Sequence, residues 1–350
     1  MVYGIIGRTA EGIELFDGQT IKTRVLVEEI KRMEPASRVL VADTYNYTKR
    51  AIKILYGIIA VLRESDFVFI MLSRNGMRVI FPIINRLNLI YKKKILHDCI
   101  GGSLDSIIKQ HSQLVKELNK FAVNWVESER LKLRLEALGV RNVEYLPNFK
   151  RLDCVKMEEI IPLHPTQFCF YTFSRVNEAK GIGKACEAVI EINRKYGYAK
   201  AKLSIYGPIE DDYDIPLKRY IDSSKGTITY CGVISPNKSV EVLRNAYALL
   251  FPTTFYGEGF PGTIIDALSA GIPIIATDWH LNNEIIKHGY TGFLYDPQKP
   301  ERLMELMEFL MNNPAMVYTM RKNCLNEARK YAPEVVMEII RKKIKSLQNQ

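Results

Sequence analysis

The chain has 350 residues, of which 47% are apolar and 25% are charged, the composition of a folded soluble protein. Its length exceeds what one hydrophobic core usually serves, so two domains are expected. The longest apolar runs, such as residues 58–62 and 67–72, are far shorter than the roughly 20 residues that a bilayer-spanning helix requires, so no spanning helix is expected. The net charge is +10, and residues 1–150 hold 24 basic against 16 acidic side chains. This surplus suits nucleic acid, anionic lipid or a phosphorylated substrate, and by itself it selects none of them.

The first residues contain no basic leader, no long apolar stretch and no small-residue cleavage site. A secretory signal is therefore not expected, and the predicted location is the cytoplasm. The six cysteines are scattered without the spacing of a zinc site, so they are interpreted as reduced thiols. Cys169 and Cys231 lie in apolar runs and are expected to be buried.

In the first half of the chain, short runs rich in branched apolar residues alternate with stretches of helical periodicity. Runs that are apolar throughout are typical of parallel strands covered on both faces. The pattern predicts a doubly wound, Rossmann-like α/β domain over residues 1–150. The predicted strands are residues 2–6, 38–42, 67–72, 94–98, 121–126 and 143–146, and the predicted helices are residues 20–31, 48–63, 104–118 and 129–138.

A polar stretch with several prolines, residues 151–165, breaks this rhythm and is predicted to be a linker. A second strand–helix series predicts another Rossmann-like domain over residues 166–330. Residues 331–350 are predicted to form a C-terminal helix that can pack back on the first domain. Two open sheets joined by a linker would face each other across a cleft at the carboxyl ends of their strands, where a ligand site is expected. The predicted strands of the second series are residues 168–173, 203–206, 227–230, 248–251 and 272–276.

The segment from Gly257 to Thr263 carries the strongest chemical signal. It follows an apolar strand and opens a helix, whose N-terminal amides and dipole suit an anion or a hydroxyl group. Glu258 and Asp266 would lie about 12 Å apart at roughly 1.5 Å per residue if the segment were helical throughout. An acid and a base that act on one glycosidic bond stand about 5 to 9.5 Å apart. The spacing therefore favours two ends of one elongated ligand over an acid–base pair.

This segment resembles the family 4 retaining glycosyltransferases, which have the two-domain GT-B fold. Their Glu-Gly-Phe pattern, followed by a second acidic residue and a Gly-x-Pro strand, matches residues 258–278, and residues 284–297 also match. The resemblance implies that Glu258 hydrogen-bonds the donor sugar and that Asp266, where the family usually has Glu, binds the ribose directly or through water. The alternative interpretation is a capped surface helix with incidental acidic residues. The implied donor loop also contains Gly259, Phe260, Pro261, Gly262 and Thr263.

The loop from Ser174 to Gly181 is similar to the Gly-Arg-Leu…Lys-Gly motif of the same family, with Ser174 in place of the usual Gly. The resemblance assigns Arg175 and Lys180 to the diphosphate of the donor. Two cations on one strand-to-helix loop can hold a diphosphate and stabilise it as a leaving group. Without the later motif, an exposed Arg/Lys loop would be the favoured interpretation.

Weaker similarities extend to the rest of the chain. Gly18 and Gln19, before the first helix, correspond to the family's phosphate loop, although Gln stands where a second Gly is common. Residues 229–234, which end at Ile234, resemble the strand and turn of the family whose backbone meets the nucleotide base. His97, at the end of a predicted strand, corresponds to a histidine that faces the donor sugar. For His97 the alternative is a structural role in the core.

Two other patterns are consistent with different functions. Asp212 and Asp214 look like the acidic metal motif of the other large glycosyltransferase fold, but a solvated loop is favoured, and no metal and no cofactor is expected besides the nucleotide-sugar donor. Residues 49–63 and 78–94 mix cations with large apolar residues, as surfaces that bind anionic membranes do. The alternative is that their apolar faces are buried and their cations are merely solvated. No nucleic acid partner is expected, because no basic–aromatic module is present.

The patterns together predict a retaining glycosyltransferase that moves a sugar from a nucleoside-diphosphate sugar to a hydroxyl of a saccharide or lipid-linked saccharide. The resemblance implies a role in bacterial cell-surface polysaccharide biosynthesis, such as capsule or lipopolysaccharide, at the inner face of the cell membrane. Nothing in the sequence indicates a protein nucleophile, so catalysis is attributed to leaving-group stabilisation and alignment. Two alternatives stay open: a nucleotide-sugar epimerase of the same fold, and a non-catalytic, membrane-associated subunit that keeps a donor pocket.

Overall fold

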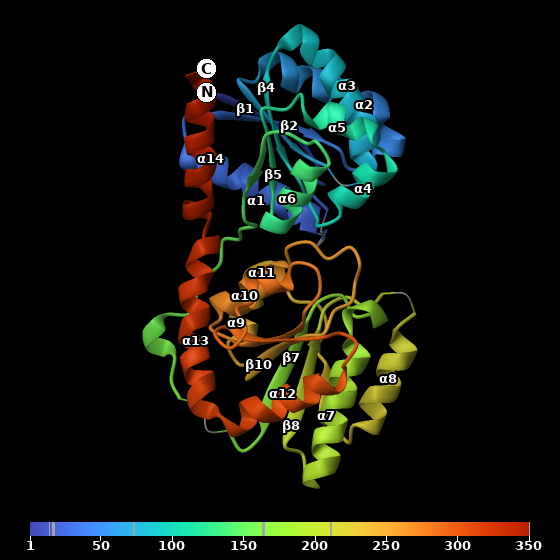
Figure 1. Cartoon of the computed structure of the whole chain (residues 1–350), viewed down its shortest axis with the longest axis vertical. Helices are drawn as coiled ribbons and strands as arrows, with labels where there is room; N and C mark the ends of the chain where they lie inside the picture. Colours follow the sequence, from blue (N-terminus) through green and yellow to red (C-terminus); the bar gives the residue numbers. More distant parts are fainter. Residues whose placement is uncertain (14, 16–17, 73, 163–164, 211, 350) are drawn as a thin grey trace. The chain divides into compact units, whose positions relative to one another are not determined.

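The structure is a computed structural model that describes residues 1–13, 15, 18–72, 74–162, 165–210 and 212–349. The chain forms two compact units, one made of Met1–Arg151 with Tyr331–Gln350 and the other of Leu152–Lys330. Each unit contains a six-stranded sheet with helices packed on it (Figure 1). This alternation of strands and helices confirms the predicted α/β class. In the described part of the chain, no helix combines the length and the apolar character of a membrane span.

The sheet of the first unit has the strand order β2-β1-β3-β4-β5-β6, and neighbouring strands run parallel. The strands are β1 (Val2–Gly7), β2 (Arg38–Asp43), β3 (Phe67–Met71), β4 (Lys94–Asp98), β5 (Val123–Val126) and β6 (Val143–Tyr145). The helices are α1 (Gly18–Met33), α2 (Tyr47–Glu64), α3 (Arg74–Tyr91), α4 (Leu104–Gln110), α5 (Gln113–Leu118), α6 (Glu129–Ala137) and α14 (Pro333–Gln348). The single helix predicted over residues 104–118 is wrong, because the backbone leaves the helical region at His111, with a φ of −139°.

Both faces of this first sheet are covered by apolar side chains. Ile70 of β3 packs in one cluster with Phe81 of α3, whereas its neighbour Phe69 packs in the opposite cluster with Trp125 and with Ile340 of α14. Successive side chains of a strand point to opposite faces, and every position of β3 is buried. The inner strands of this sheet are therefore covered on both faces, as predicted, whereas the edge strand β2 is not, and its Val41 is 40% exposed.

A cluster of ion pairs holds Arg151 and α14 to α1. The Arg151 guanidinium donates to both carboxylate oxygens of Glu29, at 2.7 and 2.6 Å, and pairs with Glu334 at 2.8 Å. Bidentate pairs between a guanidinium and a carboxylate fix geometry as well as adding energy. The chain leaves the first unit after Arg151 and returns to it shortly before Glu334. Through these ion pairs, both of these segments are attached to α1.

The sheet of the second unit has the strand order β12-β11-β10-β7-β8-β9, again with parallel neighbours. The strands are β7 (Phe168–Phe173), β8 (Ala201–Tyr206), β9 (Ile228–Tyr230), β10 (Ala248–Phe251), β11 (Ile274–Thr277) and β12 (Gly292–Tyr295). The helices are α7 (Ile182–Tyr196), α8 (Asp214–Ser223), α9 (Ser239–Leu243), α10 (Gly262–Ser269), α11 (Asn282–Ile285), α12 (Glu301–Asn312) and α13 (Pro314–Ala328). Four 3-10 turns complete the described elements: η1 (Met157–Glu159), η2 (Glu178–Lys180), η3 (Pro236–Lys238) and η4 (Arg329–Tyr331).

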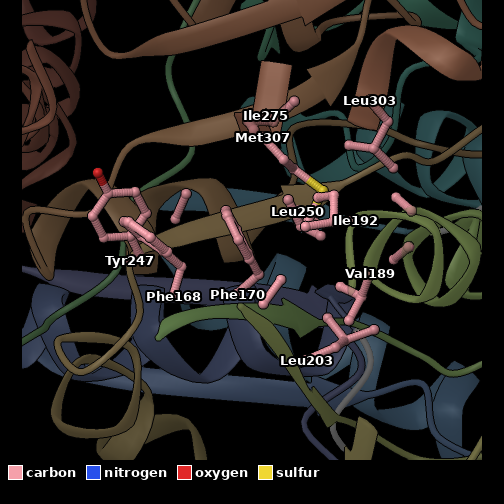
Figure 2. Packing of buried hydrophobic residues seen from close by; sticks show 14 of the residues in the cluster. Phe168, Phe170, Val189, Ile192, Leu203, Tyr247, Leu250, Ile275, Leu303 and Met307 are labelled. Atoms are coloured by element: carbon pink, nitrogen blue, oxygen red, sulfur yellow. The ribbon is translucent and has the colours of Figure 1, made fainter. Parts of the chain in front are cut away.

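The core of the second unit lies between the sheet and helices α7 and α12. Tyr247 closes one end of it, with its ring edge-on to Phe168 at 4.8 Å and its hydroxyl donating to the carbonyl of Leu310 at 2.8 Å. The buried phenol thereby keeps a hydrogen-bond partner. Figure 2 shows this packing, with the labelled side chains Phe168, Phe170, Val189, Ile192, Leu203, Tyr247, Leu250, Ile275, Leu303 and Met307.

One face of β7 and β8 is less covered than the sequence suggested. Along both strands, buried positions alternate with positions that are partly or fully exposed. Cys169 lies on the partly exposed face of β7, and Cys231, just beyond β9, is exposed, so the prediction that both are buried is wrong. An apolar run shows that one face of a strand is buried, but the cover of its second face depends on helices that are distant in the sequence.

Candidate functional site

The order of the second sheet reverses between β7 and β10, which are paired although β8 and β9 separate them along the chain. The carboxyl ends of two such strands form a topological switch point, the usual ligand site of an open parallel sheet. The loop after β7 carries Arg175 and Lys180, and the loop after β10 carries Glu258. The fold therefore brings together the two motifs that the sequence singled out in this unit.

The loop after β7 is held against the loop after β10. The side chain of Asn177 accepts a hydrogen bond from the backbone of Lys180 at 2.9 Å, which caps the turn η2. Gly181 has a φ of +72°, and a Cβ there would lie 2.2 Å from the carbonyl oxygen of Pro252. Only glycine permits this approach, and the backbone of Thr254 then donates to the carbonyl of Ala179 at 2.8 Å. The sequence Lys-Gly thus serves to place Lys180 beside the end of β10.

Lys180 and Glu258 form a buried ion pair. The ammonium contacts Glu258 Oε2, and the hydroxyl of Thr253 donates to the same oxygen at 3.0 Å. Burial lowers the pKa of Lys180 below that of an ordinary lysine, and the carboxylate of Glu258 opposes this shift. The side chains of Lys180 and Glu258 are only 7% and 11% exposed. Because a buried charge without a partner is strongly destabilising, each of these charges depends on the other.

Arg175 lies on the same loop and is partly exposed. Its guanidinium pairs with Glu210 at 3.2 Å and lies over the ring of Phe255, 4.8 Å from the ring centroid. The ammonium of Lys180 lies 4.9 Å from the same centroid. Phe255 therefore contacts both cations, and such contacts stabilise a cation on an aromatic face. Phe255 belongs to no recognisable motif, and Glu210 begins the acidic stretch that contains Asp212 and Asp214, so sequence reasoning did not find their contacts with Arg175.

Asp266 lies on α10, and its hydrogen bond with Ser239 is separate from the contact between Lys180 and Glu258. Asp266 is 2% exposed, and its carboxylate accepts a hydrogen bond from Ser239 Oγ at 3.0 Å. Ser239 begins α9 and lies in no motif that would have singled it out. Helix α10 is tied to β7 by Thr263, whose hydroxyl donates to the carbonyl of Phe173 at 2.7 Å.

The other residues of the predicted donor loop surround the start of α10. Helix α10 begins at Gly262, with Pro261 at its N-cap position. Ile234 is partly buried in the segment after β9, where the carbonyl of Gly232 accepts from the backbone of Gly207 at 2.9 Å. Gly259, Gly262 and Thr263 are partly buried, and Phe260 and Pro261 are buried.

The predicted site residues of the first half belong to the other compact unit. Gly18 begins α1, and the Gln19 side chain donates to the carbonyl of Met71 at 2.9 Å. His97 is 0% exposed, with its ring edge-on to Phe81 at 5.1 Å. These surroundings are those of a core residue.

Among the described residues, one nitrogen of the His97 ring nevertheless has no hydrogen-bond partner. Its Nδ1 lies 3.0 Å from Asn124 Oδ1, while the amide of Asn124 donates to two backbone carbonyls. Asn124 Oδ1 must then accept, so Nδ1 carries the proton and Nε2 is an acceptor that finds no partner among the described residues. Burial lowers the pKa of His97 to about 4, the Asn124 hydrogen bond opposing this and Lys22 adding to it. His97 is therefore neutral at pH 7.

A buried charge cluster at the carboxyl ends of β4 and β5 was missed by sequence reasoning. Lys22 of α1 pairs with Asp98 and with Glu127, both at 2.8 Å, and all three side chains are almost fully buried. Burial by itself lowers the pKa of Lys22, but the two carboxylates raise it above that of an ordinary lysine. The three residues stand far apart in the sequence, and only the parallel order of the strands reveals the cluster.

The described residues contain no group of three or more His, Cys, Asp or Glu side chains that could hold a metal ion. In the acidic stretch that was compared with a metal motif, Asp214 begins α8 and Asp212 has a φ of +55°. Asp211 lies outside the described residues. Chemically, the switch point of the second unit combines two cations with a carboxylate, which suits a ligand that has both an anionic group and hydroxyl groups.

The solved structure of Anabaena Alr3699/HepE in complex with UDP has the same fold. It gives a TM-score of 0.75 at 13% identity, and the alignment covers 99% of both chains. At such identity the likeness defines the fold, which is GT-B, a glycosyltransferase class, as the sequence predicted. The family model of the glycosyl transferases group 1 matches residues 156–331, half of the chain. The protein therefore belongs to this family.

Two curated relatives show what this chain is similar to. The alpha-galactosylglucosyldiacylglycerol synthase of Streptococcus pneumoniae is 24% identical over 59% of this chain and 56% of its own length. The N,N'-diacetylbacillosaminyl-diphospho-undecaprenol alpha-1,3-N-acetylgalactosaminyltransferase of Campylobacter jejuni is 24% identical over 40% of this chain and 35% of its own length. The chain thus matches about half, or less, of the length of these relatives.

Proposed function

We propose that this glycosyltransferase moves a sugar from a nucleoside-diphosphate sugar to a hydroxyl of a saccharide or lipid-linked saccharide, with retention of the anomeric configuration. The contact of Lys180 with Glu258 at the switch point, beside Arg175, is the observation that carries this proposal. A nucleotide sugar has the complementary parts, because its diphosphate is anionic and its sugar carries hydroxyl groups. The binding of UDP by the similar Anabaena structure supports a nucleotide donor.

In this proposal Arg175 and Lys180 bind the diphosphate and stabilise the negative charge that develops on it as the sugar departs. Glu258 accepts a hydrogen bond from a sugar hydroxyl and so fixes the orientation of the reacting carbon. Asp266 binds the ribose, and the segment that ends at Ile234 meets the base. The backbone of the donor loop, from Gly259 through Phe260, Pro261 and Gly262 to Thr263, contacts the sugar and phosphates. No covalent intermediate on the protein and no metal ion is part of the proposal.

The proposal assigns donor binding to the second unit and acceptor binding to the first. From the first unit, we propose in addition that Gly18 and Gln19 contact the phosphates of the donor and that His97 contacts its sugar. The two curated relatives, named for a glycolipid product and for a lipid-diphosphate acceptor, support an acceptor that carries a lipid. We therefore place the reaction in cell-surface polysaccharide or glycolipid biosynthesis, in the cytoplasm at the inner face of the membrane, with peripheral contact to anionic lipid.

The test begins with a thermal-shift screen of UDP-, GDP- and ADP-sugars, because a ligand that binds the native state raises the melting temperature. The donor found in this way is then incubated with saccharide and lipid-linked acceptors, and the anomeric configuration of the product is read by NMR. Lys180→Ala and Glu258→Ala should abolish transfer. Lys184→Ala, four residues further along on α7, and Glu241→Ala, an exposed residue of α9, are the matched controls and should retain it.

Unchanged turnover in Lys180→Ala or Glu258→Ala would overturn the site assignment. Conversion of the nucleotide sugar into its epimer without any acceptor would identify an epimerase instead. Donor binding without transfer to any acceptor would favour a non-catalytic subunit. An inverted product would contradict the proposed retention while leaving the donor site in place.

A further inference from the structure

Helices α2 and α3 of the first unit present an exposed surface that takes no part in the proposed donor site. The two helices pack against each other and contribute to the same core cluster (Figure 1). Their inward residues, such as Ile58 and Phe81, are buried. Their outward side includes large apolar side chains that are strongly exposed: Ile52 at 75%, Tyr56 at 71%, Val79 at 61%, Leu89 at 75% and Ile90 at 74%.

Cations surround these apolar side chains. Exposed cations of this part of the chain include Lys49, Arg50 and Lys53 of α2, Arg78 and Arg86 of α3, Lys92 after α3 and Lys94 at the start of β4. Together with the five exposed apolar residues, we call this surface the α2–α3 face. Arg63, which is also exposed on α2, is left out of it because it is paired with Glu64. An open hollow on α2 is lined by Lys49, Arg50, Ala51, Ile52, Lys53 and Tyr56, so cationic and apolar side chains meet at one place.

The α2–α3 face has almost no negative charge. Residues 44–63 and 67–97 contain no Asp or Glu. Glu64, at the end of α2, is already paired with Arg38 at 3.2 Å and with Arg63 at 2.9 Å. Within the described ranges, no carboxylate pairs with a cation of the face. The cations are therefore available to an external anion.

We infer that the α2–α3 face docks on the surface of a bilayer that contains anionic lipid. The apolar side chains would enter the boundary between headgroups and acyl chains, and the long basic side chains beside them would reach the lipid phosphates. A peripheral contact of this kind needs no spanning helix. The inference deepens the proposed function, on which its biological sense rests, because it would hold the first unit beside a lipid-linked acceptor.

The composition of the face favours a membrane over an acidic protein. The centres of protein–protein interfaces are depleted in lysine, because each buried ammonium must find a partner of fixed geometry. On this face, cations and apolar residues alternate along both helices, and a fluid headgroup layer can place a phosphate at each cation wherever it lies. Ile52 and Tyr56, one helical turn apart and flanked by Lys49 and Lys53, are the centre of the face on α2.

Flotation of the full chain with lipid vesicles tests the inference. Vesicles of phosphatidylcholine alone are compared with vesicles of phosphatidylcholine and phosphatidylglycerol, at low and at high salt. The variants are Ile52→Ser with Tyr56→Ser, and Lys49→Gln with Lys53→Gln. The matched controls are Leu133→Ser, an exposed leucine on α6 of the same unit, and Lys109→Gln with Lys116→Gln, which removes the same charge elsewhere.

Binding should require phosphatidylglycerol and weaken at high salt. Each double variant of the face should lower the bound fraction about ten-fold or more, and the controls should bind as the wild type does. The UDP-induced thermal shift should be the same in all variants, so a failure of vesicle binding is distinguishable from a failure of the donor site. Equal binding by face and control variants, equal binding to both kinds of vesicle, or no binding would overturn the inference. Capture on an acidic polymer with no binding to vesicles would overturn it in favour of a polyanionic partner.

Discussion

The ammonium of Lys180 lies against the carboxylate of Glu258, although 78 residues separate them along the chain. This contact joins the loops that follow β7 and β10, at the place where the strand order of the second sheet reverses. If these two side chains grip different parts of the donor, as proposed, the donor must replace their mutual attraction with its own contacts. Without a donor, each side chain compensates the charge of the other.

The first prediction concerns this ion pair and the stability of the second unit. Glu258→Gln should lower the free energy of unfolding of this unit by about 3 to 4 kcal/mol, because it leaves a buried ammonium without a counter-ion. Lys180→Met combined with Glu258→Gln should cost less than the sum of the single changes. Denaturant unfolding is followed by Trp279 fluorescence in a Trp125→Phe background, since these are the two tryptophans and they lie in different units. Strictly additive effects would show that the pair does not couple.

The second prediction is a loss of nucleotide affinity at alkaline pH. Burial holds the pKa of Lys180 below that of an ordinary lysine, so the ammonium loses its proton earlier as the pH rises. A neutral amine no longer attracts a diphosphate, and the affinity for UDP should fall through this lowered pKa. Lys180→Arg should move the fall to higher pH, because guanidinium stays protonated.

The measurement for this second prediction uses Trp279, whose indole donates to the carbonyl of Phe255 at 2.9 Å, next to both cations. Quenching of its fluorescence reports UDP binding across the pH range. Uridine, which lacks the diphosphate, serves as the control and should show no such fall. An identical pH profile for Lys180→Arg and the wild type would contradict the role of Lys180.

A third prediction concerns Ser239. Ser239→Ala should weaken UDP binding by about five- to ten-fold, because removal of one hydrogen bond to a carboxylate loses roughly 1 to 1.5 kcal/mol of the energy that orients it. Asp266 would keep its charge but lose the partner at 3.0 Å. Isothermal titration with UDP measures the effect, and Ser235→Ala, an exposed serine of the same segment, is the control. If Ser239→Ala and Ser235→Ala bound UDP with equal affinity, Ser239 would have no role in nucleotide binding.

The fourth prediction follows from His97 and applies to the first unit. Its pKa is lowered to about 4 from 6.5, so between these pH values the unfolded chain binds a proton that the native state does not. Stability is therefore lost as the pH falls from 6.5 to 4, by up to about 3 kcal/mol from this residue. His97→Phe removes the titrating group and should flatten the pH dependence, although it leaves Asn124 Oδ1 without its donor. Unfolding is followed by the fluorescence of Trp125 in a Trp279→Phe background. If the free energy of unfolding of His97→Phe depended on pH as steeply as that of the wild type, the prediction would be refuted.

The fifth prediction concerns Lys22. Lys22→Met leaves the buried carboxylates of Asp98 and Glu127 unpaired, and should lower the stability of the first unit by about 3 to 5 kcal/mol at neutral pH. Burial already raises the pKa of Asp98, with Lys22 opposing, so without Lys22 the carboxylate will bind a proton at higher pH. The difference in the free energy of unfolding between Lys22→Met and the wild type should therefore become smaller as the pH falls. Lys31→Met, an exposed residue of the same helix, is the control, and a gap independent of pH would contradict this account.

The sequence by itself determined the α/β class and the family. Apolar runs that alternate with helical periodicity define parallel strands with helical crossovers, because both periodicities follow from local backbone geometry. The Glu258 and Lys180 motifs were visible for the same local reason: glycine, charge and spacing around one strand end can be read without knowing what lies opposite.

Only the tertiary structure decided which distant residues meet. Phe255 and Glu210 at Arg175, Ser239 at Asp266, and the cluster around Lys22 come together through strand order, which no local pattern specifies. The cover of each surface was decided in the same way. Cys231 is exposed and His97 is enclosed, and on α2 and α3 part of the apolar residues is buried while the rest stands exposed among cations. Burial depends on what packs against a residue from elsewhere in the chain, and this is the physical reason why the sequence could propose the chemistry of the site but not its surroundings.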